Sequence, residues 1–86
     1  MKTMEPIHPG QILKTEFLSP AGLTEKSFAE AIGASEDAVH QLVIGKVGIT
    51  ASLALRFAGY FGNSAEFWMN LQTHYDLEIE RDRAHI

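Results

Sequence analysis

The chain has 86 residues, enough for one domain, and a domain of this size buries only about 60% of the surface that its unfolded chain exposes. Its hydrophobic share of 45% supports a single core, and the absence of cysteine excludes disulfides, thiolate metal sites and cysteine nucleophiles. The formal net charge of −4 has the wrong sign for binding a polyanion over the whole surface, so any such binding requires a local basic area.

No segment approaches the run of about 18 apolar residues that predicts a membrane span. The N-terminus, residues 1–6, has neither the apolar stretch nor the small-residue cleavage site of a secretory signal. We therefore expect a cytoplasmic protein with no membrane partner. We also expect residues 1–7 to be a flexible N-terminus, residues 8–80 to form the domain and residues 81–86 to be a C-terminal tail.

Capping residues divide the chain into helices more clearly than intrinsic propensity does. Pro9 suits a first helical turn, and a first helix is expected over residues 11–18, where apolar residues follow helical spacing. Thr24 is a good N-cap for a second helix, which stops at Gly33. Ser35 is then the N-cap of a third helix.

The third helix is expected to end at Gly45, and a fourth is expected between an N-cap at Thr50 and a stop at Gly62. Ser64 caps a fifth helix that runs to about Glu80. No stretch alternates apolar and polar residues for long enough to predict a strand. The predicted fold class is therefore all-α, with five helices.

The second and third helices are joined by only three residues, which is the geometry of a helix-turn-helix motif. Ala29 is small where the helices would meet, Gly33 suits a left-handed turn, and Val39 fills the angle between them. A helix-turn-helix presents its second helix to the DNA major groove. On the spacing alone, an ordinary helical hairpin in a bundle is the alternative.

Longer stretches of the chain carry a family resemblance. They are His8–Leu13, Glu16–Leu18, Leu23–Thr24, Phe28–Ala29, Ile32–Gly33, Gly45–Lys46, Gly48–Ala51, Ala54–Ala58, Ser64–Gln72 and Tyr75–Leu77. On these residues the chain resembles the HigA-type antitoxins, which include proteins called virulence-associated protein I. They form part of the phage-repressor-like (XRE) helix-turn-helix class. The stretches Phe67–Gln72 and Gly48–Thr50 are specific to this family, whereas many repressors share the helix-turn-helix core.

The resemblance implies an antitoxin that neutralises a HigB-type, ribosome-dependent mRNA-cleaving toxin by direct binding. It also implies a repressor that binds double-stranded operator DNA as a homodimer, and a protein that is not an enzyme. The acidic net charge suits toxin binding, because a toxin that handles RNA is expected to be basic. We expect the toxin to cover the first helix and residues 8–10 before it.

The third helix is the expected recognition helix. Its candidate DNA-binding residues are Ser35, Glu36, Asp37, His40 and Gln41. Glu36 or Asp37 can accept a hydrogen bond from cytosine N4, and Gln41 can pair with adenine. Alternatively, the two acidic residues only complement the helix dipole.

The candidate phosphate contacts are Lys26, Lys46 and Thr50, the last because it lies at a helix N-terminus. Members of the family often carry Gln at the start of the second helix to hold a phosphate, whereas this chain has Glu25, which would repel one. Many members also have a basic or amide residue after the recognition helix, where this chain has Ile44 and Val47 around Gly45-Lys46. Arg56 is expected only to decorate the fourth helix.

The fifth helix carries more apolar residues than one face of so small a domain can bury, which favours a dimer interface there. The candidate dimer residues are Phe67, Trp68, Leu71, Tyr75 and Leu77. The alternative for such an aromatic stripe is simple core packing.

Other chemistry has little support. His74 and Glu78 lie four residues apart, but a metal site needs at least a third ligand, so no metal and no cofactor are expected. No strand-turn-helix elbow or glycine-rich phosphate loop surrounds the serine, histidine and aspartate residues, so no catalytic residues are expected. The rival function is a protein-interaction module that binds only the toxin. Glu25, Glu36 and Asp37 favour it.

Overall fold

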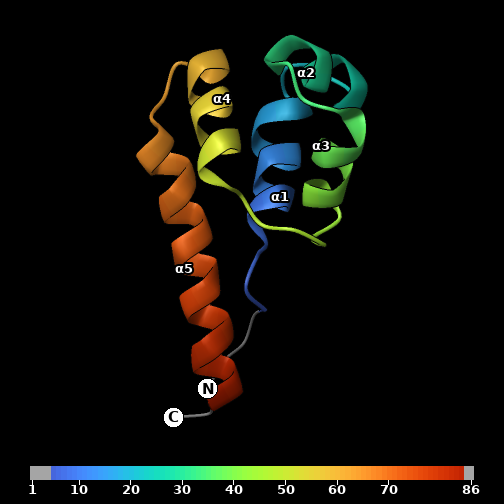
Figure 1. The fold of residues 1–86 in the computed structure, drawn as a ribbon. Coiled ribbons are helices and arrows are strands. Elements are labelled where there is room, and N and C mark those ends of the chain that lie inside the picture. The colour runs from blue at the N-terminus through green and yellow to red at the C-terminus, as the bar shows by residue number, and fades with distance from the viewer. Residues whose placement is uncertain (1–4, 85–86) are drawn as a thin grey trace.

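The structure is a computed structural model that describes residues 5–84 (Figure 1). Within that range the chain forms five helices and no strand, as predicted. The helices are α1 (Pro9–Ile12), which continues directly into the π-helical segment η1 (Leu13–Leu18), α2 (Glu25–Ile32), α3 (Glu36–Val43), α4 (Ala51–Phe61) and α5 (Ala65–Ala84). The expected flexible N-terminus and C-terminal tail fall partly on residues 1–4 and 85–86, which lie outside the described residues.

The predicted N-caps form hydrogen bonds at the expected places. Thr24 Oγ1 accepts from the backbone N–H of Ser27 at 3.0 Å, and Ser35 Oγ accepts from that of Ala38 at 3.0 Å. The hydroxyls of Thr50 and Ser64 make the same bond three residues ahead. Each such bond satisfies one of the N–H groups that a helix leaves unpaired at its N-terminus.

The first helix differs from the expected regular α-helix. The backbone N–H of Ser19 donates to the carbonyl of Lys14, five residues earlier, at 2.9 Å. This wider turn brings Leu13, Phe17 and Leu18, at positions i, i+4 and i+5, against the core. The helix begins at Pro9, which the sequence predicted to suit a first helical turn.

The first helix packs against α3 and α5, while α2 packs against α3 and α4. Figure 1 shows α1 lying between α3 and the α4–α5 pair. Gly10 lies so close to α3 that a Cβ atom there would overlap the carbonyl oxygen of Leu42. Glycine is therefore required at this contact for reasons of space.

Aromatic rings fill the centre of the domain. Trp68 of α5 packs against Phe17, Phe57 and Phe61, with ring centroids between 4.7 and 5.8 Å apart. Its indole Nε1 donates to Asn63 Oδ1 at 2.8 Å, which satisfies its polar group inside the core. The fully or nearly fully buried apolar residues are Leu13, Leu18, Phe28, Ala29, Ile32, Val39, Leu42, Ile49, Ala54, Phe57 and Trp68.

Helix α5 has 20 residues and ends at Ala84, beyond the expected end near Glu80. Arg81 and Arg83 lie in its last turn, where cations interact favourably with the helix dipole. Figure 1 shows its C-terminal half extending beyond the other helices, which makes the molecule elongated, with extents of 42 × 21 × 21 Å. Within residues 5–84, no helix is both long and apolar enough to cross a membrane.

Candidate nucleic-acid interface

Helices α2 and α3 form the predicted helix-turn-helix. Gly33 ends α2 in the left-handed conformation, with φ of 71° and ψ of 29°. Ala29 and Val39 are buried, with exposed fractions of 1% and 0%. A larger residue at Ala29 would separate the helices, and a β-branched residue at Gly33 would be strained at positive φ.

Arg56 has a different role from the expected one. Its Nη1 donates to the carbonyl of Ile32 at 2.8 Å and to that of Gly33 at 3.2 Å. These carbonyls belong to the C-terminal end of α2, where a cation is favoured. Arg56 of α4 therefore secures the turn of the motif.

One face of α3 is exposed, as a recognition helix requires. Glu36, Asp37 and His40 lie on its outer face and line a shallow hollow there. Gln41 is half-buried, and its Nε2 lies 3.5 Å from Asp37 Oδ1. Ser35 is occupied in capping α3, which leaves four candidate side chains on or beside this face.

The acidic residue at the start of α2 is paired with the recognition helix. Glu25 Oε1 lies 2.8 Å from His40 Nδ1. This contact joins two of the helices that would approach DNA. It also occupies the carboxylate that was expected to repel a phosphate, and it fixes the orientation of the His40 ring. A sequence alone cannot pair two side chains 15 positions apart.

The candidate phosphate contacts lie on both sides of α3. Lys26 is exposed in the first turn of α2, beside the residue that contacts His40. Lys46 is exposed after α3, and its backbone N–H donates to the carbonyl of Gln41 at 2.9 Å. Thr50 is exposed and caps α4. Lys26 is thus next to a residue that contacts α3, Lys46 directly follows α3, and Thr50 ends the loop that leads from α3 to α4.

The candidate dimer residues on α5 differ in exposure and form three groups. Trp68 is 0% exposed, so the expectation that it forms a dimer contact is wrong, because its side chain is enclosed by the core of its own chain. Phe67 and Leu77 are 38% and 47% exposed. Leu71 and Tyr75 are half-buried.

The histidines have no metal-binding arrangement in the described part of the chain, where no group of three or more possible ligand side chains is found. His74 Nε2 lies 3.5 Å from Glu78 Oε1, so the spacing of four residues forms an exposed polar pair.

Comparisons with known proteins place this fold. A search of protein-family models found no match. The chain is 44% identical over 84 residues to virulence-associated protein I of Dichelobacter nodosus, and the match covers 96% of this chain and 78% of that protein. It is also 44% identical over 78 residues to antitoxin HigA-1 of Vibrio cholerae, covering 91% of this chain and 73% of that one.

The fold is similar to solved structures that contain DNA. The antitoxin HigA of Pseudomonas aeruginosa, solved with the higBA promoter, matches at a TM-score of 0.88 and 40% identity, over 92% of this chain and 86% of that one. Antitoxin GraA in complex with its operator matches at a TM-score of 0.81 and 37% identity, over 92% and 80% of the two chains. HigA-1, HigA and GraA are antitoxins, so the prediction that the chain is not an enzyme is confirmed. With the resemblance now found across almost the whole chain in both sequence and fold, the chain belongs to the HigA family of helix-turn-helix antitoxins.

Proposed function

We propose that this chain is the antitoxin of a toxin–antitoxin pair, which represses its own operon by binding operator DNA as a homodimer and neutralises a HigB-type mRNA-cleaving toxin by direct binding. The main support is the exposed recognition helix of a helix-turn-helix whose relative was solved with its promoter. The motif is complete here, because Gly33 makes the turn and Arg56 secures it.

In this function α3 lies in the major groove with its N-terminal residues toward the bases. Gln41 pairs with adenine, and Glu36 or Asp37 accepts from cytosine N4. Lys26, Lys46 and the N-terminus of α4 at Thr50 contact the phosphates on either side. The Glu25–His40 contact keeps a carboxylate engaged that would otherwise face the backbone of the DNA.

A homodimer fits the shape of the chain. The exposed Leu77 and Phe67, with the half-buried Leu71 and Tyr75, supply apolar surface along α5. A two-fold axis at α5 has to place the two copies of α3 about 34 Å apart, so that they enter successive major grooves on one face of the duplex. Trp68 contributes only by holding α5 on the domain.

The toxin is the second partner. A net charge of −4 attracts a basic, RNA-handling protein over a long range and speeds the encounter. The first helix and the residues before it remain the proposed contact surface. Lys14, Thr15 and Glu16 are exposed there and available to a partner.

The test is binding to the chain's own upstream DNA, measured by gel shift and fluorescence anisotropy over a series of salt concentrations. If Lys26, Lys46 and one helix N-terminus per subunit contact phosphates, a dimer neutralises about four to six of them. The slope of log affinity against log salt is then about −4 to −5. This dependence is shallow for a repressor.

Two variants separate phosphate contacts from base contacts. Lys46→Ala should weaken binding to every sequence and reduce the slope by about one for each phosphate that is no longer neutralised. Gln41→Ala should change which sequence is preferred, at a cost of about 1–3 kcal/mol per half-site. Equal effects of both variants on all sequences would contradict the assignment of Gln41.

A protein-interaction module without DNA binding is the second candidate, and the acidic side chains of Glu36 and Asp37 on the outer face of α3 favour it. Absence of operator binding at about 50 mM salt, where phosphate contacts are strong, both for the chain alone and with its toxin, would replace the first proposal with this one.

A further inference from the structure

The loop between α3 and α4, residues 44–50, carries two of the proposed phosphate contacts, Lys46 and Thr50. Its first part is held by α3, since the N–H groups of Gly45 and Lys46 donate to the carbonyls of Leu42 and Gln41. Its last part leads into Thr50, the N-cap of α4. Neither of these contacts holds residues 47–49 in the middle of the loop, whose partner lies on another helix.

Helix α5 supplies that contact through Gln72. The Oε1 atom of Gln72 accepts from the backbone N–H of Ile49 at 2.7 Å, while Nε2 donates to Asp76 Oδ1 at 2.9 Å. Asp76 therefore fixes the orientation of the amide, so that its oxygen faces the loop. Ile49 itself is only 4% exposed, so its N–H would lose a needed partner if Gln72 were removed.

The approach of Gln72 depends on Gly48. A Cβ atom at Gly48 would lie 2.9 Å from Cδ, Nε2 and Oε1 of Gln72, closer than ordinary van der Waals contact. Because these atoms form the end of the Gln72 side chain, a side chain at Gly48 would displace the amide of Gln72 from its place beside Ile49. The loop backbone and the amide of Gln72 thus form one close contact.

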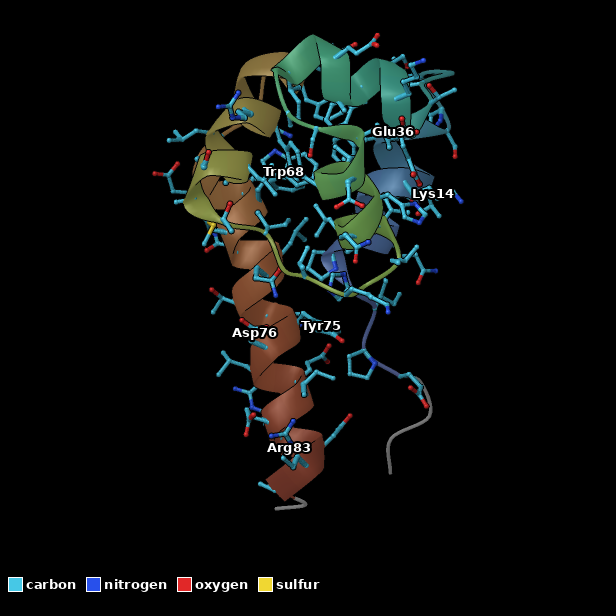
Figure 2. All side chains as sticks on the ribbon, turned by 45° about the vertical axis from the view of Figure 1, so that its right-hand side comes forward. Lys14, Glu36, Trp68, Tyr75, Asp76 and Arg83 are labelled. Atoms are coloured by element: carbon cyan, nitrogen blue, oxygen red, sulfur yellow. The ribbon has the colours of Figure 1, made fainter. Side chains whose placement is uncertain are left out.

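One turn further along α5, Tyr75 contacts His8, whose ring lies beside the start of the loop at Gly45. The ring of Tyr75 packs edge-on against His8, with centroids 4.9 Å apart, and Figure 2 shows Tyr75 projecting from α5 away from the helix axis. A Cβ atom at Gly45 would lie 3.7 Å from the His8 ring. The stretch Phe67–Gln72, which carries part of the family resemblance, therefore both fills the core through Trp68 and holds this loop through Gln72.

We propose that Gln72 is a positioning residue for DNA binding, which holds residues 48–50 so that the N-terminus of α4 at Thr50 faces the phosphates. The inference rests on the proposed operator binding. Gln72 touches no DNA in this arrangement and acts only through the loop. Removal of the Gln72 amide should therefore weaken binding to all sequences alike and leave the base preference unchanged.

The test compares operator binding and binding to unrelated DNA by the full-length chain and its variants, at a temperature where circular dichroism shows each to be folded. Gln72→Ala should weaken both affinities about tenfold, the effect of removing one hydrogen bond, and leave their ratio unchanged. In the Lys46→Ala background its effect should be fully retained, because α3 holds Lys46 and the two residues act on separate phosphate contacts.

The double variant Gln72→Glu with Asp76→Asn is the matched control. The carboxylate introduced at position 72 accepts from Ile49 N–H and from the amide introduced at position 76, so the hydrogen bonds and the net charge are both retained. The double variant should restore operator binding to near the wild-type value, whereas Gln72→Glu alone should not, because two carboxylates then face each other. A purely structural role would lower the melting temperature of Gln72→Ala without changing the affinity of the folded chain.

The outcomes are distinct. A wild-type chain that binds no operator would overturn the proposed function and this inference together. If the wild-type chain binds the operator, two results would overturn the inference alone. One is that folded Gln72→Ala binds as tightly as the wild type, and the other is that the double variant does not recover binding.

Discussion

At the residue scale, Gly10 shows how closely two helices can approach when a side chain is absent. Its Cα lies against the carbonyl of Leu42 at the end of α3, and it is buried. The contact holds the first helix against the recognition helix. Gly59, in contrast, lies in the last turn of α4 with open space where a Cβ atom would point.

The same substitution at these two positions should therefore have opposite effects. Gly10→Ala should reduce the free energy of unfolding by at least about 3 kcal/mol, because the methyl group overlaps backbone that cannot move alone. Gly59→Ala should raise it by about 0.5–1 kcal/mol through helix propensity. Urea denaturation followed by circular dichroism measures both, and a tolerated Gly10→Ala would contradict the close packing of α1 on α3.

The structure also favours one protonation state of the His8 ring. Its Nδ1 accepts from the backbone N–H of Gly10 at 2.9 Å, which caps α1 and requires an unprotonated nitrogen. Desolvation by burial lowers the pKa of His8 below its ordinary value of 6.5, although the Asp76 carboxylate and a hydrogen bond with the Val47 backbone oppose this shift. The folded chain therefore favours the neutral form of the His8 ring.

This pKa shift predicts a loss of stability in acid. As the pH falls below about 6.5, the unfolded chain takes up the His8 proton before the folded chain does, so the free energy of unfolding decreases. The loss is complete only below the lowered pKa of the folded state. Urea denaturation between about pH 8 and pH 5, the range in which histidine titrates, should show a smaller decrease for His8→Asn, whose amide oxygen can still cap α1.

Exposed His74 provides the control for this experiment. The variant His74→Asn should keep the pH dependence of the wild type, because its ring has no such cap to lose. Identical pH profiles for wild type and His8→Asn would refute the role of His8.

At the element scale, three contacts hold α2 and α3 in the helix-turn-helix arrangement. Ala29 allows α2 and α3 to meet, Arg56 of α4 binds the carbonyls at the end of α2, and the Glu25–His40 contact joins the start of α2 to the middle of α3. The recognition helix is therefore oriented by the rest of the domain. Its own eight residues are too few to be stable as an isolated helix.

Ala29→Leu tests the helix crossing. It should reduce the free energy of unfolding by about 1–3 kcal/mol, because the added atoms enter a filled contact. Ala31→Leu, the same change on the exposed face of α2, should alter it by no more than about 0.5 kcal/mol. Thermal melting of the two variants provides the comparison, and an unchanged melting temperature for Ala29→Leu would rule out the close crossing.

At the scale of the whole molecule, α5 has two roles along its length. Its first half inserts Trp68 into the core and holds the α3–α4 loop through Gln72. Its second half extends beyond the other helices and carries Arg83 and the exposed Leu77 (Figure 2). Together with Phe67 and Leu71 in the first half, this second half is the surface that the proposed dimer would cover.

Leu77→Asp should then weaken dimerisation at least about tenfold, the equivalent of about 1.4 kcal/mol, by placing a charge in an apolar contact. Leu55→Asp is the matched control, because Leu55 is 66% exposed on α4 and lies outside the proposed interface. Sedimentation at micromolar concentrations measures both. A wild-type chain that sediments as a monomer, or a Leu77→Asp variant that dimerises as tightly as Leu55→Asp, would show that α5 is not the interface.

The sequence by itself determined the helices and the motif. The N-caps Thr24, Ser35 and Thr50 bond to backbone N–H groups three residues ahead, and Gly33 turns the chain through its own φ angle. These features depend only on neighbouring residues, so they can be predicted without knowing the fold. The family resemblance followed from such stretches too. The extension of α5 to Ala84 and the π-helical turn of the first helix were missed, because packing and helix-end electrostatics decide them.

Only the tertiary structure decided which distant groups meet. The Glu25–His40, Gln72–Ile49 and Arg56–Ile32 contacts join residues 15, 23 and 24 positions apart. The burial of Trp68 required aromatic rings from the first helix and from α4 to surround it. Such contacts depend on the arrangement of whole helices, and residue type alone does not specify it, because an exposed and a buried tryptophan on an amphipathic helix look the same in the sequence.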